Sequence, residues 1–265
     1  MPLDVDYPWG VDSLTVVHKP IPQLGNRTLF DWVVAQVGMV PQFWGRYIGL
    51  KPDPNLPLLS PLRADEADYI FSHSDTQCRI LVVYNVLNNT PPTQLPKGQR
   101  LLTPGSVRNE FVDGQMDAQR AAQAATDASV PADYTIMIYG DIEDAWQPTA
   151  EWIRGWWAGM RDSAYQGQGG LYANLNVPNF TQPYLKAQGL SPAGAGSRFL
   201  WSTQPVRGCV LPRNINFAYQ PVQIPKCLDP VVVWQYGRDV YRGCLSGWAD
   251  FNLCNGDGYD SMWKA

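Results

Sequence analysis

Short apolar segments recur along the chain and alternate with longer amphipathic ones. Several of the short segments are unbroken apolar runs, such as residues 80–84 and 231–234, which is typical of parallel strands buried on both faces. The segments that we predict to be strands are residues 9–16, 43–49, 79–86, 135–143, 169–174, 198–204, 231–236 and 248–253.

Apolar residues at helical spacing predict helices between these strands. Thr28 is expected to cap a helix that reaches Val37, and Ser60 followed by Pro61 has the pattern of a cap and a first helical residue. Further helices are predicted over residues 117–129, from Thr149 onward and over residues 181–190. This alternation predicts an α/β fold, a single (β/α)8 TIM-like barrel domain that spans residues 1–265. A doubly wound open sheet is the competing architecture, but no glycine-rich turn follows the first strand.

Two stretches interrupt the alternation. Residues 90–113, which are rich in proline and glycine, follow the third strand, and residues 205–230 follow the sixth. Neither has a clear period, and no convincing helix follows strands six and seven. We therefore expect a barrel that is irregular in its last strands, with long loops after strands 3 and 6 at the end where barrels bind ligands.

Composition narrows the classes of function. The 265 residues carry a net charge of −4 and contain no basic run, so nucleic acid is not an expected partner. No apolar run reaches the roughly 18 residues of a membrane span. His18 and His73 are far apart in sequence, which disfavours histidine-rich metal sites and histidine-dependent triads, and we predict neither a metal nor a cofactor. Abundant carboxylate and aromatic side chains suit a neutral ligand rich in hydroxyl groups.

The five cysteines bear on whether the protein is exported or cytoplasmic. No Cys-x-x-Cys motif is present, and Cys78 is expected to be a buried thiol. Cys209 with Cys227, and Cys244 with Cys254, are candidate disulfides of a secreted or cell-surface domain whose leader is absent. Five reduced thiols in a cytoplasmic protein are the open alternative.

The window around residue 141 has the most informative chemistry. In a strand, Tyr139, Asp141 and Glu143 share one face while Ile138 and Ile142 share the other. Two carboxylates about 6.5–7 Å apart perturb each other, and the more apolar environment is expected to raise the pKa of one of them. Cleavage of a glycosidic bond needs such a protonated acid together with an anionic group. The alternative is that Asp141 and Glu143 lie in a solvated loop before the helix that starts at Thr149 and have no catalytic role.

Other predicted strand ends add polar groups. Asp12 lies near the end of the first strand, Asp250 and Asn252 lie in the last, and the two strands are neighbours in a closed barrel, so Asp12 and Asp250 are expected to meet. Arg46 is expected to pair with one of these acids. The aromatic residues at strand ends are candidates for stacking on sugar rings or, alternatively, for packing inside the barrel. They are Tyr47, Tyr84, Tyr139, Tyr172, Trp201 and Trp234.

The chain resembles the glycoside-hydrolase-like domain family DUF1906, also named the Rv2525c-like family, which is in turn similar to the family 25 lysozymes. Five motifs spread over the chain carry the resemblance. They are Gly10-Val11-Asp12-Ser13, Trp44-Gly45-Arg46-Tyr47-Ile48-Gly49, Tyr139-Gly140-Asp141-Ile142-Glu143, Trp234-Gln235-Tyr236 and Asp250-Phe251-Asn252.

The resemblance implies a (β/α)8-like barrel that acts on a polysaccharide or a peptidoglycan-type glycan, or that descends from such an enzyme. It implies that Glu143 matches the general acid and Asp141 the partner carboxylate, with Asp12 and Asp250 as the acids of the first and last strands. Gln235 and Asn252 join the predicted sugar-binding set.

Two functions from different classes therefore stand as hypotheses. The first is a glycoside hydrolase that uses carboxylate acid/base catalysis. The alternative is a catalytically inactive carbohydrate-binding or cell-surface module of the same fold. A metal-dependent deacetylase or nuclease is disfavoured because histidines are scarce.

Overall fold

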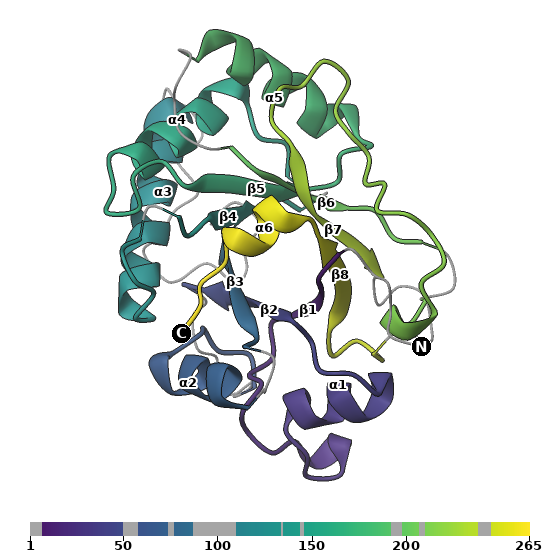
Figure 1. The fold of residues 1–265 in the computed structure, drawn as a ribbon. Coiled ribbons are helices and arrows are strands. Elements are labelled where there is room, and N and C mark those ends of the chain that lie inside the picture. Colours follow the sequence, from purple (N-terminus) through teal and green to yellow (C-terminus); the bar gives the residue numbers. More distant parts are fainter. Residues whose placement is uncertain are drawn as a thin grey trace.

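Eight strands close into a barrel in the order in which they occur along the chain (Figure 1). The structure, a computed structural model, describes residues 7–49, 58–73, 77–86, 110–133, 135–143, 146–191, 198–206, 210–237 and 245–265. The strands are β1 (Trp9–Ser13), β2 (Phe43–Ile48), β3 (Arg79–Asn85), β4 (Ile138–Asp141), β5 (Gly169–Ala173), β6 (Leu200–Thr203), β7 (Val231–Gly237) and β8 (Asp250–Cys254). The predicted TIM-like α/β barrel is confirmed.

The helices follow the capping signals in part. The described helices are α1 (Leu29–Val37), α2 (Ala64–Ser72), α3 (Glu110–Asp127), α4 (Ala150–Arg161), α5 (Pro178–Leu190) and α6 (Gly256–Asp260). Thr28 caps α1 and Thr149 caps α4 through side-chain bonds to backbone N–H groups, as predicted. The prediction at Ser60 and Pro61 is wrong, because α2 begins only after Arg63, and the carbonyl of Ser60 accepts a bond from Arg46 instead.

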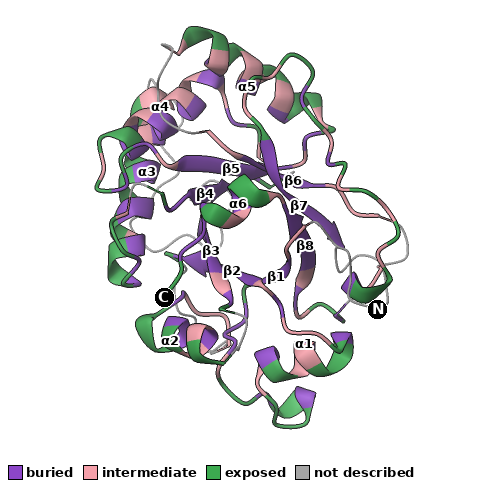
Figure 2. Ribbon diagram, viewed as in Figure 1, coloured by how far each residue is buried: buried purple, intermediate pink, exposed green. Residues whose placement is uncertain are grey.

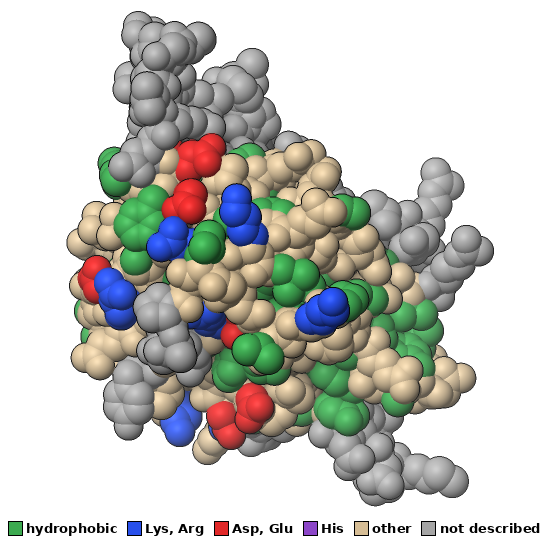
Figure 3. Space-filling model, turned by 90° about the horizontal axis from the view of Figure 1, so that it is seen from above, with side chains coloured by type: hydrophobic (Ala, Val, Ile, Leu, Met, Phe, Trp, Pro, Cys, Tyr) green, Lys and Arg blue, Asp and Glu red, His purple; other side chains and the backbone are tan. Residues whose placement is uncertain are grey.

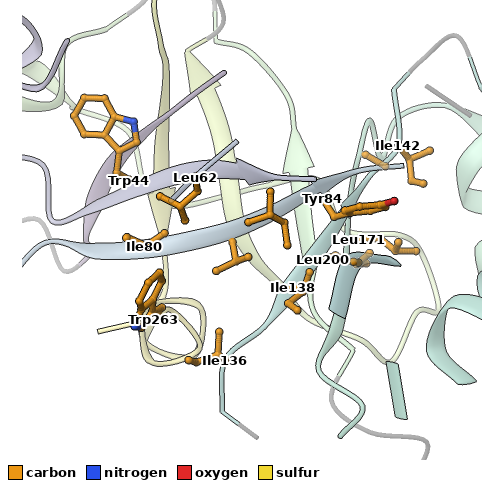
Figure 4. Close-up of a cluster of buried hydrophobic side chains, with 14 of the residues drawn as sticks. Trp44, Leu62, Ile80, Tyr84, Ile136, Ile138, Ile142, Leu171, Leu200 and Trp263 are labelled. Atoms are coloured by element: carbon orange, nitrogen blue, oxygen red, sulfur yellow. The ribbon is translucent and has the colours of Figure 1, made fainter. Parts of the chain in front are cut away.

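Two layers of side chains separate along the strands, because successive residues point to opposite faces. The outer layer lies between the barrel and the helices, and Figure 4 shows part of it, with Ile80, Ile138, Leu171 and Leu200 contributed by four successive strands. The second layer fills the barrel interior. Figure 2 shows the consequence, a ring of buried strands surrounded by helices that expose their outer faces.

β8 departs from the parallel pattern. β1 to β7 pair in parallel, whereas β8 is antiparallel to both β7 and β1. As a result, β8 begins at the end of the barrel where the parallel strands finish, and Asp250 lies at that end.

The C-terminal segment closes the opposite end of the barrel, a feature that the sequence pattern did not predict. The backbone N–H of Ile80 donates to the carbonyl of Trp263 at 2.8 Å, and that of Met137 donates to Ser261 at 2.8 Å. Figure 1 shows α6 lying across the ring of strands. Since the amino ends of the strands are covered in this way, a ligand must enter at their carboxyl ends.

The two predicted long loops are described only in part. Most of the predicted long loop after β3, residues 90–109, lies outside the described residues. Between β6 and β7 the described residues form only one short 3-10 helix, Pro212–Asn214, which agrees with the prediction that no α-helix follows strand six.

Neither candidate disulfide forms. Cys227 and Cys254 are free thiols, and their proposed partners Cys209 and Cys244 lie outside the described residues. Cys78 is a buried thiol, as predicted, and burial raises its pKa. No helix in the described part of the chain is long and apolar enough to cross a membrane.

Candidate functional site

The barrel interior changes from apolar to polar along its axis. Toward the closed end it is filled by apolar and aromatic side chains, among them Phe43, Leu81, Met137, Tyr139, Val233 and Met262. At the open end the inward positions carry polar side chains, namely Asp12, Asn85, Asp141, Thr203, Gln235, Asp250 and Asn252. Polar groups are costly to bury unless they are bonded or functional, so their concentration at one end marks the candidate site.

Asp12 and Asp250 meet at this end. They are direct partners in the β1–β8 register. Nε2 of Gln235 lies 3.1 Å from Oδ2 of Asp12 and 3.2 Å from Oδ2 of Asp250, so a single amide donates to both carboxylates. Nδ2 of Asn252 donates a further bond of 2.7 Å to Oδ2 of Asp12. The antiparallel direction of β8 is what brings Asp250 to this position.

A second set of bonds fixes the two amides. Oε1 of Gln235 accepts from the hydroxyl groups of Tyr172 at 2.9 Å and Thr203 at 2.7 Å, which leaves Nε2 facing the acids. Oδ1 of Asn252 accepts from the indole N–H of Trp201 at 3.0 Å. The rings of Tyr172 and Trp201 meet edge to face with centroids 4.6 Å apart. The acids are thus held by a network that spans five strands.

Gly45 leaves the space that this network occupies, because glycine has no side chain. It is the β2 partner of Asp12 in the register, and a Cβ at this position would lie 2.6 Å from Cβ of Asp12 and 3.6 Å from the ring of Trp201. Any larger residue would push the acid or the indole out of place.

β4 contributes the remaining two acids. Ile138 and Ile142 join the outer layer as predicted, and Asp141 is buried in the interior with 1% of its surface exposed. β4 ends at Asp141, so Glu143 lies two residues beyond the strand and is exposed. The expectation that Asp141 and Glu143 both extend a regular strand is therefore wrong, and the pair combines one buried and one exposed carboxylate.

Tyr47 lies among these acids. Burial raises the pKa of its hydroxyl well above the ordinary value, and the charges of Asp141, Asp12 and Glu143 contribute to the same rise. Acids from β1, β4 and the segment after β4 thus act electrostatically on the same hydroxyl. Tyr47 consequently remains protonated, and it is a hydrogen-bond donor over the physiological pH range.

A small pocket of about 50 Å³ adjoins Glu143 at the carboxyl ends of β4 and β5. Its lining combines apolar side chains with a tryptophan, two amides and a carboxylate. The lining residues are Ile142, Glu143, Trp146, Ala173, Asn174, Val177, Asn179 and Phe180.

Arg46 does not reach the site. Its guanidinium is fully buried on the outer face of β2, where Nε lies 2.9 Å from Oε1 and Nη2 3.1 Å from Oε2 of Glu66 in α2. It also donates to the carbonyl of Ser13. The prediction that Arg46 pairs with a site acid is wrong, because its neighbour Tyr47 faces the interior and alternation sends Arg46 to the other side.

Tyr84 and Trp234 also belong to the outer layer. Tyr84 stacks on Trp156 of α4 with centroids 6.3 Å apart, and Figure 4 shows it among outer-layer residues. The indole N–H of Trp234 donates to the carbonyl of Gln204 at 2.9 Å. Both residues lie next to inward-facing positions, Asn85 and Gln235, so neither points into the barrel.

The other predicted binding residues face inward, but at different depths. Tyr47, Tyr172, Trp201, Gln235 and Asn252 lie within the polar network or beside its acids. Tyr139 is inward too, in the apolar part of the interior. Burial raises its pKa, and its hydroxyl is close to Ser261 at the closed end, so it lies away from the acids.

Two inward polar residues were missed. Asn85 is the register partner of Asp141, and its Oδ1 is buried without a hydrogen-bond partner among the described residues. Thr203 donates to Gln235. Each is two residues beyond an inward-facing side chain, Val83 or Trp201, so the period of two was the signal that could have identified them.

On the face shown in Figure 3, acidic and basic side chains are interspersed and neither gathers into a patch. The described residues contain no group of three or more histidine, cysteine, aspartate or glutamate side chains placed to hold a metal ion.

Comparison with solved structures identifies similar folds. An uncharacterized protein of B. stearothermophilus is 26% identical with a TM-score of 0.70, over 97% of this chain and 100% of that one. The Mycobacterium tuberculosis Tat-secreted protein Rv2525c, in complex with HEPES, is 15% identical with a TM-score of 0.53, over 97% of this chain and 98% of its own. Its complex with L-tartrate gives 16% identity and a TM-score of 0.50, over 93% and 95% of the two chains.

No protein-family model matches the chain, and no curated protein matches it either. The similarity to Rv2525c, at this level of identity, is one of fold, and the chain shares a closed α/β barrel with this secreted protein.

Proposed function

We propose that the protein is a glycoside hydrolase that acts on a polysaccharide or peptidoglycan-type glycan at the open end of the barrel. The observation that carries the proposal is the gathering of carboxylates at the open end of the barrel, where Asp12 and Asp250 are register partners and Asp141 is buried at the end of β4. Glycosidases need two carboxylates with different roles, and different environments are what separate such roles.

In this proposal Glu143 is the general acid. It is exposed and lines a pocket, so it can approach the oxygen of a glycosidic bond and protonate the leaving group. Asp141, buried two residues before it, is the partner carboxylate, which orients or stabilises the reacting sugar. The hydroxyl of Tyr47 donates a hydrogen bond to a carboxylate or to the sugar.

Asp12 and Asp250 have a binding role in this scheme. Oδ2 of Asp12 accepts hydrogen bonds from the side-chain amides of Gln235 and Asn252, which fixes the position of the carboxylate. A carboxylate held in this way accepts hydrogen bonds from sugar hydroxyl groups without having to reorganise. Tyr172, Trp201, Gln235 and Asn252 are positioning residues, because their hydrogen-bonding groups are engaged with one another and with the acids.

A carbohydrate-binding module without turnover is the second candidate. The pocket beside Glu143 favours it, since a tryptophan and two amides bind sugar whether or not a bond is cleaved. Calorimetry that detects glycan binding, with no new reducing ends after long incubation, would identify this function.

We further propose that the chain is a member of the DUF1906 group and that it is exported. The motifs around Asp12, Glu143 and Asp250 support membership, and the Tat-secreted structural neighbour supports export.

The test of the hydrolase is a screen of polysaccharides, including bacterial cell wall, for released reducing ends. The wild type is compared with Glu143→Gln and with the control Glu151→Gln, a half-buried glutamate on α4 that pairs with Arg154. We expect Glu143→Gln to lower the rate about a hundredfold or more and the control to leave it unchanged. Equal rates for the wild type and Glu143→Gln would refute the assignment of the acid.

A further inference from the structure

We infer that Asn85 is a further sugar-binding residue at the open end of the barrel, and that its amide bonds to hydroxyl groups of the ring that Asp141 orients. The inference rests on the proposed function. Asn85 is the last residue of β3 and the register partner of Asp141 on β4. Leu81 and Val83 fill the barrel interior, so the period of two along β3 turns Asn85 inward as well.

Asn85 differs from the two other inward amides at this end. The oxygen of Gln235 accepts two hydrogen bonds and its nitrogen donates two. In Asn252, Oδ1 accepts from Trp201 and Nδ2 donates to Asp12. In Asn85, by contrast, Oδ1 is buried without a hydrogen-bond partner, and Nδ2 bonds to no residue that the structure describes. The polar network therefore engages two of the three amides and leaves the third available to a ligand.

The amide of Asn85 does not stabilise the fold through hydrogen bonds. A buried acceptor that lacks a donor costs free energy, and an aliphatic side chain of the same shape would avoid this cost. Asn85 is half-buried, so its side chain borders the solvent at the open end. Water supplies the missing donor in the free protein, and a hydroxyl group of a ligand takes its place on binding. An amide at this position thus serves binding rather than stability.

The groups around Asn85 match the hydroxyl groups of a neutral sugar. An amide offers one acceptor and two donors, and each hydroxyl both donates and accepts, so two neighbouring hydroxyl groups of a ring can bond to Oδ1 and Nδ2 of one asparagine. Neighbouring strands lie about 4.8 Å apart, so the same ring can also contact Asp141. The charge of Asp141 acts on the hydroxyl of Tyr47, the β2 partner of Val83, and it repels anionic ligands.

The first part of the test measures glycan binding by calorimetry. Chitotetraose, cellotetraose and soluble fragments of bacterial cell wall are titrated into the wild type, Asn85→Leu and Asn85→Ala. Gln123→Leu, which removes an exposed amide on α3, is the control. We expect at least one of these glycans to bind the wild type, with a dissociation constant about fivefold higher or more in both Asn85 variants and unchanged in the control.

The second part measures stability by urea denaturation, which a binding role and a structural role affect differently. Asn85→Leu keeps the branched shape and removes only the amide, so we expect a midpoint no lower than that of the wild type. Asn252→Leu removes an amide whose two polar atoms are both engaged, and its midpoint should fall. If both Asn85 variants unfold at or below the midpoint of Asn252→Leu, the amide of Asn85 is structural and the inference is overturned.

The outcomes separate the role of Asn85 from the hydrolase. A wild type that binds none of the three glycans, or Asn85 variants that bind them as tightly as the wild type, overturns the inference even if glycan hydrolysis is observed. Weaker binding by the folded Asn85 variants of a protein that releases no reducing ends supports the inference and refutes hydrolysis.

Discussion

Asp12 and Asp250 face each other across the seam between β1 and β8, and a single amide group, Nε2 of Gln235, donates to both. Two carboxylates at neighbouring positions repel each other, and this repulsion is tolerable only where donors stabilise the pair. The arrangement depends on the reversal of β8, since a parallel eighth strand would place its first residue at the closed end of the barrel.

Gln235→Leu should therefore destabilise the protein. The substitution keeps the approximate volume but removes the shared donor and leaves the hydroxyl groups of Tyr172 and Thr203 without their acceptor. We expect the free energy of unfolding, measured by urea denaturation, to fall by about 1–3 kcal/mol. Gln123→Leu, at an exposed site on α3, serves as the control and should change it by less than about 0.5 kcal/mol. Equal stability of Gln235→Leu and wild type would show that the shared donor is dispensable.

Gly45→Ala should displace Asp12. The added Cβ would lie 2.6 Å from Cβ of Asp12, and neither strand can move without disturbing the register. We expect a loss of about 1–3 kcal/mol in stability together with weaker glycan binding or turnover. Gly189→Ala is the matched control, because a Cβ there meets no atom within 4 Å and alanine favours the helix. A Gly45→Ala protein with normal stability and glycan binding would contradict the close packing against Asp12.

Arg46→Met should be strongly destabilising. Removal of the guanidinium leaves Glu66, which is 1% exposed, as a buried carboxylate without its partner. We expect a loss of about 3–5 kcal/mol in the free energy of unfolding. Arg161→Met, which breaks an exposed pair with Asp162, should cost less than about 1 kcal/mol. If Arg46→Met folds as stably as wild type but binds glycan less well, the outward placement of Arg46 is wrong.

The period of two explains both the successes and the errors of the sequence analysis. It placed Asp12 and Asp141 inside the barrel and Ile138 and Ile142 outside. The same rule excludes adjacent residues of one strand from both facing the interior. Arg46 beside Tyr47, and Trp234 beside Gln235, could not all be site residues, and applying the rule to every strand would have removed Arg46, Tyr84 and Trp234.

Other features of the fold could not be predicted from the local pattern of apolar and polar residues. The direction of β8, which is antiparallel to β7, is not encoded in the spacing of its own residues. The end of β4 at Asp141 depends on pairing with β5, and α6 is too short to show a helical period. These are tertiary properties, and the position of Glu143 relative to Asp141 follows from one of them.

Tyr47→Phe should change the alkaline limit of stability. Because the pKa of Tyr47 is raised in the folded protein, its contribution is complete below the ordinary value near 10. Above that pH the unfolded chain releases the proton while the folded protein keeps it, so stability falls by about 1.4 kcal/mol per pH unit for this residue. Urea denaturation at pH 9 and pH 11 should show a smaller loss for Tyr47→Phe than for wild type. Equal losses would contradict the raised pKa of the buried Tyr47 hydroxyl.

The most direct test of the acid cluster compares glycan hydrolysis by Asp12→Asn and Asp141→Asn with hydrolysis by Asp162→Asn, an exposed control. Each rate is measured at a temperature at which thermal unfolding shows the variant to be folded. We expect both cluster variants to release reducing ends at least about a hundredfold more slowly than wild type and the control to match it. Wild-type rates in folded Asp12→Asn and Asp141→Asn proteins would contradict a catalytic site at the open end of the barrel.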